Sequence, residues 1–265
     1  MGFDVGFIGA GAMGGALLKG IRHHRPELAV AVYDVRQEAM DQAAGEGAYP
    51  VKSIPELVSE CGIVFVAVKP QMFPDVLPFV RDGLRERTLV ICITPGFDFE
   101  YWHQSLGENA AMTRTIPNLP AMVGEGLTLI AFDEAVTADE RERITGLFQC
   151  VGEVTELPEH LLDAGMCGSS ASPAFVAMMI EAMADGIVSL GIPRAQAYVI
   201  CAQAVRGTAG MLLETGMHPA VLKDRVCSPG GMTIQGVMAL EAGGFRSQVI
   251  EAMEATYRKS QQIRS

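Results

Sequence analysis

The first 34 residues constrain the fold of this chain more than any other stretch. Residues 5–8 form a short apolar run, and Gly-Ala-Gly-Ala-Met-Gly follows at positions 9–14. The residues up to Ile21 are typical of a helix, and residues 30–33 are typical of a second strand that ends at Asp34. A strand, a tight glycine turn, a helix and a further strand that ends in an acid form the dinucleotide-binding fingerprint.

Each glycine of the turn has a physical reason to be there. Gly9 allows the sharp turn, Gly11 lets the backbone approach a pyrophosphate, and Gly14 lets the helix pack closely on the strand. The phosphates then lie against the N–H groups and positive dipole end of the helix. The alternative is a flexible Gly/Ala turn in a chain with 29 glycines. The preceding strand and the acid twenty residues after Gly14 disfavour it.

Bulk properties exclude several classes of partner. The net charge of −11 argues against nucleic acid and anionic membranes, and 49% hydrophobic residues suffice for a sizeable core. The six cysteines form no CxxC pair and no zinc-type spacing with histidine, so we expect buried thiols in a reducing cytoplasm and no metal. Residues 1–5 lack the basic segment of a signal peptide, and the best membrane-span candidate, residues 174–190, is interrupted by Glu181 and Asp185.

The order of patterns along the chain predicts two domains. Strands and helices alternate up to about Glu156, which predicts right-handed crossovers and a doubly wound, parallel α/β sheet. We expect strands at residues 5–8, 28–33, 63–68, 89–93, 111–115 and 127–132. After about Leu157 only helices are expected, at residues 161–190 in two pieces with Pro173 opening the second, 194–214, 220–226, 232–242 and 245–262. The expected domains are 1–158, which binds the dinucleotide, and 159–265, which is all-helical.

The helix expected over residues 175–190 is apolar on more than one face. Such a helix is normally buried all round, and a helical domain of about a hundred residues has too little interior to bury it alone. We therefore expect a homodimer. The alternative is burial against the chain's own sheet domain.

Three segments are expected at the carboxyl edge of the sheet, where ligands of such sheets bind: residues 9–14, 67–70 and 113–120. Lys69 leaves a buried strand towards the cofactor, although a solvated lysine at a loop start is the alternative. Asn118 is expected to bond either the cofactor or a neighbouring loop. The expected cofactor-binding residues are Gly9, Gly11, Ala12, Met13, Gly14, Asp34, Arg36, Ala67, Val68, Lys69, Pro70 and Asn118.

Asp34 bears on the choice between the two nicotinamide cofactors. A carboxylate there binds the adenosine ribose hydroxyls and repels a 2′-phosphate. Arg36 and Arg22 are close enough in sequence to offset part of that repulsion. We expect NAD(P)H, with a lean towards NADH.

A second glycine-rich stretch, Ser-Pro-Gly-Gly-Met-Thr at residues 228–233, precedes an apolar helix. Consecutive backbone N–H groups at a helix N-terminus bind anions, here of carboxylate size, and the hydroxyls of Ser228 and Thr233 add donors. The alternative is an ordinary serine N-cap with proline in the first turn.

These segments together resemble the pyrroline-5-carboxylate reductase family. The resemblance rests on residues 8–16, 67–71, 114–121, 172–175, 181–186 and 222–233, and it continues through residues 240–246. It implies a Rossmann domain, a helical dimerisation domain whose dimers assemble further, and reduction of 1-pyrroline-5-carboxylate to L-proline by NAD(P)H. It also implies that residues 228–233 hold the substrate carboxylate and that the Thr233 hydroxyl bonds the ring nitrogen. The expected catalytic residues are Thr233 and Lys69, and the expected substrate-binding residues are Ser228, Gly230, Gly231, Met232 and Thr233.

Three positions depart from the family pattern. Residues 168–172 read Gly-Ser-Ser-Ala-Ser where the family is richer in glycine, Met232 replaces a smaller residue and is expected to narrow the pocket, and Tyr49 replaces a polar residue.

Two other functions compete with the reductase. A β-hydroxyacid dehydrogenase needs a proton-transferring side chain on the first helix of the second domain, but residues 164–193 contain no Lys, His or Arg. A non-catalytic nucleotide-binding regulator would not need the anion site at residues 228–233.

Overall fold

The computed structural model describes residues 2–108 and 110–263, and the chain divides into two compact units. The sheet unit comprises residues 1–170 and 257–265, and the helical unit comprises residues 171–256. This division falls twelve residues after the boundary expected from the sequence, and it assigns the end of the last helix to the sheet unit.

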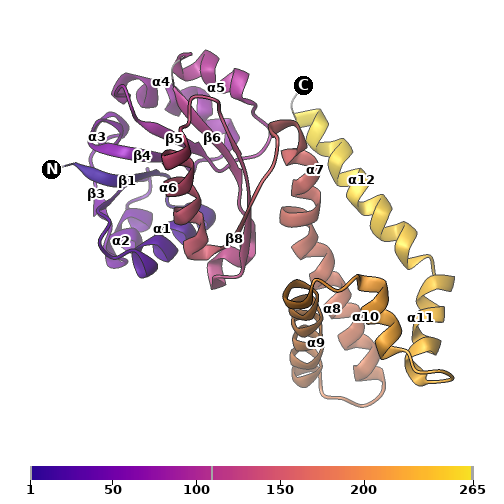
Figure 1. Ribbon diagram of the computed structural model, residues 1–265. Helices are drawn as coiled ribbons and strands as arrows, with labels where there is room; N and C mark the ends of the chain where they lie inside the picture. Colours follow the sequence, from indigo (N-terminus) through magenta and orange to yellow (C-terminus); the bar gives the residue numbers. More distant parts are fainter. Residues whose placement is uncertain (1, 109, 264–265) are drawn as a thin grey trace. The chain divides into compact units, whose positions relative to one another are not determined.

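The described part of the sheet unit contains an eight-stranded sheet in the order β3-β2-β1-β4-β5-β6-β7-β8 (Figure 1). The strands are β1 (Phe3–Ile8), β2 (Val30–Tyr33), β3 (Tyr49–Pro50), β4 (Cys61–Val66), β5 (Leu89–Cys92), β6 (Ala111–Ile116), β7 (Gly126–Phe132) and β8 (Gly152–Glu156). All neighbours pair in parallel except β6 and β7. Residues 117–125 are too few for the crossover that a parallel pair requires, so the chain reverses direction there.

Helices cover both faces of the sheet. They are α1 (Ala12–His24), α2 (Gln37–Gly45), α3 (Ile54–Glu60), α4 (Phe73–Gly83), α5 (Phe99–Leu106) and α6 (Ala138–Phe148), with short turns η1 (Pro70–Met72), η2 (Leu119–Val123) and η3 (Gln149–Val151). Side chains of α1, α2 and α6 pack on one face, and those of α3, α4 and α5 pack on the other. Successive residues of β4 and β5 alternate between these two clusters, as the two-residue period of a strand requires. The near-continuous apolar runs of the sequence follow from this two-sided burial.

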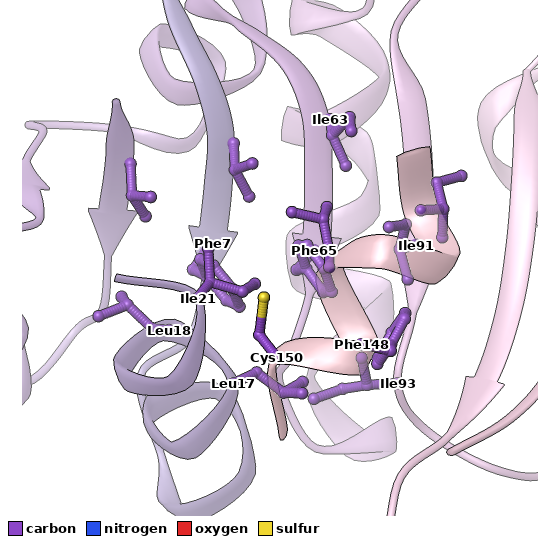
Figure 2. Packing of buried hydrophobic residues seen from close by; sticks show 14 of the residues in the cluster. Phe7, Leu17, Leu18, Ile21, Ile63, Phe65, Ile91, Ile93, Phe148 and Cys150 are labelled. Atoms are coloured by element: carbon purple, nitrogen blue, oxygen red, sulfur yellow. The ribbon is translucent and has the colours of Figure 1, made fainter. Parts of the chain in front are cut away.

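Aromatic rings form the centre of the first cluster (Figure 2). Phe7 of β1 stacks on Phe65 of β4 with ring centroids 4.5 Å apart, and Phe148 meets Phe65 edge-on at 5.6 Å. Leu17 and Ile21 of α1 lie over the same strands, which holds the start of α1 close to the end of β1. The core therefore fixes the glycine turn between them.

The helical unit is made of helices with a small interior. The helices from residue 159 onwards are η4 (Glu159–Leu161), α7 (Leu162–Met166), the π-helical turn η5 (Cys167–Ala171), α8 (Ser172–Ser189), α9 (Arg194–Thr215), α10 (Pro219–Val226), α11 (Met232–Ala242) and α12 (Phe245–Ile263). Of these, η4, α7 and the end of α12 belong to the sheet unit. The buried cluster of this unit joins Ala184 of α8 to Ala197 and Cys201 of α9. Large apolar side chains remain exposed along the same helices, among them Met178, Met183, Tyr198, Val199, Ile200, Leu213, Met238 and Leu240.

The structure corrects the expected elements in two ways. The two-residue β3, the polar strand β8 and helix α5 were not predicted. The sheet is not wholly parallel, because β7 runs against β6. The two helical pieces expected over residues 161–190 are α7 and α8, with Pro173 in the first turn of α8, and the π-turn Cys167–Ala171 joins them into one run.

Candidate functional site

The backbone of the glycine turn has the geometry that its three glycines suggest. Gly9 has φ +99°, and a Cβ there would lie 2.7 Å from the carbonyl oxygen of Ala67. A Cβ at Gly14 would lie 2.4 Å from the carbonyl oxygen of Gly9, so only glycine lets α1 start this close to the strand ends. A Cβ at Gly11, in contrast, would meet no described atom within 4 Å. Gly11 therefore leaves an open approach to the backbone.

The N-terminus of α1 is free to bind an anion. Its N-cap is Gly11, and no side chain accepts a hydrogen bond from the first-turn N–H groups in the described structure. Unsatisfied N–H groups and the positive end of the helix dipole favour phosphate oxygens. The open approach at Gly11 and the uncapped helix together fit the pyrophosphate of a dinucleotide.

Two of the three predicted segments meet directly at this edge. A Cβ at Gly9 would lie 2.7 Å from the Ala67 carbonyl oxygen, and the Ala67 N–H donates to the carbonyl of Ile8, the residue before Gly9, at 2.8 Å. The third segment, residues 113–120, is connected through β5. The Thr115 hydroxyl donates to Cys92 at 2.9 Å, and the Thr94 hydroxyl donates to the Val68 carbonyl at 3.2 Å.

Lys69 lies between the sheet and turn η1. It is exposed, it is the N-cap of η1, and Pro70 begins that turn. Ala67 and Val68 are half-buried beside the glycine turn. The four residues thus pass from the buried strand to the surface at the edge where the cofactor is expected.

Asp34 is buried, and its carboxylate is well supplied with donors. One oxygen accepts from the Ala10 N–H at 2.8 Å, and the other accepts from the Arg36 N–H at 2.9 Å and from its guanidinium at 3.2 Å. Burial alone would raise the pKa of Asp34, but the hydrogen bonds from Arg36 and Ala10 outweigh it and hold the pKa below its ordinary value. Arg22 does not join this group, because it donates to the carbonyls of Pro26 and Leu28.

A cavity of about 890 Å³ begins at the glycine turn and extends along the outer face of α1. Ala10, Gly11 and Ala12 line one part of it, and Arg36 lines another. Asp34, Lys69 and Asn118 do not belong to its lining, which continues along α1 to His23 and His24. The cavity therefore coincides with the predicted cofactor-binding residues only at the glycine turn and at Arg36.

Asn118 is buried, and its side chain joins two other segments. Its Nδ2 donates to the carbonyl of Ser169 at 3.0 Å, and its Oδ1 accepts from the Leu127 N–H at 2.8 Å. Of the two partners expected for Asn118, the structure shows the neighbouring segments.

The stretch 228–233 forms a second uncapped helix start. The Gly231 N–H donates to the Ser228 carbonyl at 3.0 Å, and Gly230 has φ +66°. Gly231 is the N-cap of α11 and no side chain caps that helix, so the alternative of a serine N-cap with proline in the first turn is wrong. Thr233 is exposed in the first turn, and Met232 before it is 93% exposed in the single chain.

Sequence reasoning missed two polar pairs in the sheet unit. Arg114, inside β6 and 2% exposed, pairs with Glu159 at 2.6 Å, and Glu159 also accepts from the Phe99 N–H at 2.7 Å. His103 of α5 pairs with Asp133 at 2.5 Å. An arginine in the middle of a buried strand was the available signal for the first pair, since such a charge needs a partner.

Among the described residues no group of His, Cys, Asp and Glu has the arrangement of a metal site.

Two family models match the chain. Residues 159–263 match the model described as pyrroline-5-carboxylate reductase dimerisation, and residues 4–96 match the one described as NADP oxidoreductase, coenzyme F420-dependent.

By length and composition alone, the helical run Glu159–Ser189 is the one candidate membrane span among the described residues. The dimerisation model covers the same residues, which favours a helix that packs against protein.

Similar proteins span the whole length of the chain. Pyrroline-5-carboxylate reductase of Escherichia coli (strain K12) is 40% identical over 263 residues, 98% of this chain and 97% of that protein. A solved pyrroline-5-carboxylate reductase from Coxiella burnetii superposes with a TM-score of 0.93 at 26% identity over all of both chains. A Plasmodium falciparum pyrroline carboxylate reductase with NADP bound gives a TM-score of 0.88 at 27% identity over 99% of this chain and 100% of that one.

Proposed function

We propose a function from one premise: the chain belongs to the pyrroline-5-carboxylate reductase family. It reduces the cyclic imine 1-pyrroline-5-carboxylate to L-proline with NAD(P)H, the last step of proline biosynthesis. The observation that carries this proposal is the pair of uncapped, glycine-preceded helix starts at α1 and α11. One fits a pyrophosphate and the other fits a carboxylate, and the reaction requires both anions to be bound.

The sheet unit holds the cofactor in this proposal. The N–H groups at the start of α1 bind the pyrophosphate, and Asp34 with Arg36 binds the adenosine ribose. Residues 67–70 and the loop at residue 118 border the nicotinamide, with Lys69 as the charged side chain at that edge. When bound, the nicotinamide supplies the hydride for the reduction.

The stretch 228–233 holds the substrate. The Ser228 hydroxyl and the N–H groups of residues 230–233 bind its carboxylate, and the Thr233 hydroxyl bonds the ring nitrogen. A cyclic imine carries its own basic nitrogen, and once protonated it accepts hydride readily. The chain therefore needs to position the substrate and has no need of a strong acid. This explains a reductase whose proposed substrate stretch contains no His, Asp or Glu.

The physiological form is a homodimer through residues 159–263, and we propose that dimers assemble further. We also propose that residues 1–158 bind the cofactor, that residues 159–265 bind substrate and form the dimer, and that the enzyme is cytoplasmic. The proposed cofactor lean is towards NADH.

Oxidation of NADH and of NADPH, each followed with 1-pyrroline-5-carboxylate, tests the activity directly. Turnover with at least one cofactor is expected, and no turnover with either would overturn the proposal. In the same assay Thr233→Val is expected to lower kcat about 10- to 100-fold through the lost hydroxyl bond, with the cofactor Kd unchanged. Thr155→Val, on the exposed face of β8, is the matched control and keeps wild-type kinetics. Unchanged kinetics for Thr233→Val would remove that hydroxyl from the mechanism.

The cofactor lean rests on Asp34 and has its own test. Asp34→Ser removes the carboxylate and leaves the Arg36 guanidinium available to a 2′-phosphate. The ratio of kcat/KM for NADPH to that for NADH is expected to rise about tenfold, the effect of roughly one charge-assisted hydrogen bond. Adding Arg36→Ala to Asp34→Ser should reverse the rise. A ratio that does not move would contradict the assignment of Asp34.

A further inference from the structure

The π-turn Cys167–Ala171 has a cause in the sequence. In an α-helix the N–H of residue i+4 donates to the carbonyl of residue i. For Ser169 that donor would be residue 173, which is proline and has no N–H. The proline ring also crowds the carbonyl four residues before it. The helix widens at this point, and such single π-turns are frequent at functional sites.

Asn118 supplies a donor to the carbonyl whose i+4 N–H is missing. Its Nδ2 lies 3.0 Å from the Ser169 carbonyl oxygen, and the two residues are only 8% and 4% exposed. The Oδ1 of the same side chain accepts from the Leu127 N–H, and the Ser170 hydroxyl donates to the Pro117 carbonyl at 3.3 Å. Loop 117–118 is thus held by one buried and two partly buried hydrogen bonds.

This loop lies where its position matters for the reaction. It follows β6 directly, and the Thr115–Cys92 and Thr94–Val68 hydrogen bonds connect that strand end to the segment that contains Lys69. A shift of about 1 Å in such a supporting contact changes catalytic rates by as much as 100-fold.

We propose that Asn118 is a positioning residue, whose amide takes the place of the hydrogen bond that Pro173 removes at Ser169 and so fixes loop 117–118 at the carboxyl edge of the sheet. This inference rests on the proposed function and deepens it. It reassigns Asn118 from a cofactor ligand to a residue that acts through the backbone around it, and it couples two residues that are 55 positions apart.

Two substitutions test the Asn118 donor and the missing N–H of Pro173 separately. Asn118→Asp keeps the acceptor for the Leu127 N–H but loses the donor to Ser169. Pro173→Ala restores an N–H at residue 173 and lets the helix satisfy Ser169 itself. Pro78→Ala is the matched control, because Pro78 also lies inside a helix, α4, but is distant in sequence from both loop and π-turn.

Asn118→Asp is expected to lower kcat at least tenfold while the Kd for NADPH changes less than about twofold, and to raise the primary deuterium isotope effect on kcat. In the Pro173→Ala background the same substitution should change kcat by less than about threefold, and in the Pro78→Ala background its full effect should remain. The inference fails if the cofactor Kd rises as much as kcat falls, if only the thermal midpoint moves, or if the effect of Asn118→Asp is the same in all three backgrounds.

Amide hydrogen exchange of the homodimer without substrate separates this inference from the proposed reaction. Asn118→Asp should speed exchange across residues 117–124, and Pro173→Ala should slow it across residues 167–173 and cancel the first effect. Absence of both changes overturns the coupling even in an active enzyme. A wild-type protein inactive with 1-pyrroline-5-carboxylate, but with both changes, overturns the reaction and keeps the coupling.

Discussion

The two units of the chain bury their apolar residues to very different degrees. The sheet unit has two large clusters, one on each face, with rings such as Phe7, Phe65 and Trp102 fully buried. The helical unit has a buried cluster of only Ala184, Ala197 and Cys201. Its helices are no less apolar, but their large side chains remain exposed in the single chain. The sheet unit therefore builds its own interior, whereas the helical unit needs a second copy to complete one.

Family membership agrees with this physical difference, because the dimerisation model covers residues 159–263. Contiguous apolar surfaces of this extent are uncommon on monomers, and interfaces of obligate dimers resemble a domain core cut in half. The difference between the units leads to predictions in which substitutions in the helical unit affect dimer association and substitutions in the sheet unit affect folding stability.

The largest effect is expected from a charge on the exposed apolar surface of the helical unit. Met178→Glu, on α8 where the side chain is 68% exposed, places a carboxylate in the proposed dimer interface, which costs several kcal/mol unless it is paired. Because each copy contributes one such carboxylate, the dimer dissociation constant should rise more than about 10,000-fold, or about 5.5 kcal/mol. Sedimentation equilibrium measures it. Phe79→Glu, on α4 and 52% exposed, is the control and should leave the dimer intact. The opposite pattern would refute the comparison.

A core truncation in the sheet unit should cost less and act without the partner. Phe65→Ala removes a fully buried ring that packs between Phe7 and Phe148, and we expect a loss of about 3–5 kcal/mol. The single tryptophan, Trp102, is buried in the same unit, so its fluorescence follows urea unfolding there.

The midpoint shift for Phe65→Ala should be the same at low and high protein concentration. Phe65→Leu should give a smaller shift, because it leaves a smaller cavity. A shift that grows on dilution would show that the sheet unit, too, depends on the dimer for its stability.

The sequence contained strong local signals for the parts of the fold that were predicted. The glycine turn, the buried strands and the capped helices follow from periodicity and backbone chemistry. The reversal at β7 was also within reach, since residues 117–125 are too short for a parallel crossover. Strands β3 and β8 were not, because one has two residues and the other is an edge strand with a mainly polar sequence. Helix α5 had a cap signal at Asp98 that was overlooked.

The site shows the same division between local and long-range information. The turn at Gly9 and the close helix–strand approach at Gly14 were predictable, because the local strand-turn-helix geometry requires both. The partners of Asn118, Arg114 and Asp34 were not, since they depend on which distant atoms the fold brings within 3 Å. Arg22 illustrates the limit, because closeness in sequence to the second strand suggested a partner that the structure does not give it.

The smallest predicted effect concerns acid, which should weaken the sheet unit first. Its buried carboxylates Asp34 and Glu140 have lowered pKa values, whereas the groups with shifted pKa values described in the helical unit are the bases Arg194 and Lys223. At Glu140 burial would raise the pKa, but hydrogen bonds from Thr137 and then Arg87 outweigh it. Glu140 completes the capping box of α6, accepting from the Thr137 N–H at 2.9 Å and from Arg87 at 2.6 Å.

A carboxylate whose pKa is lower in the folded chain stabilises the fold above its unfolded pKa, about 4.3 for Glu, and this contribution is lost as the pH falls through the folded value. Glu140→Gln should therefore cost roughly 1 kcal/mol at pH 7 and progressively less below pH of about 4. Urea midpoints read from Trp102 fluorescence at both pH values measure the difference. Glu142→Gln, exposed on the same helix, should show no pH-dependent cost. The cost of Glu140→Gln could instead stay constant from neutral to acid pH. Protonation of Glu140 would then remove none of its advantage over glutamine, and the ionised carboxylate would contribute nothing to the stability of the cap.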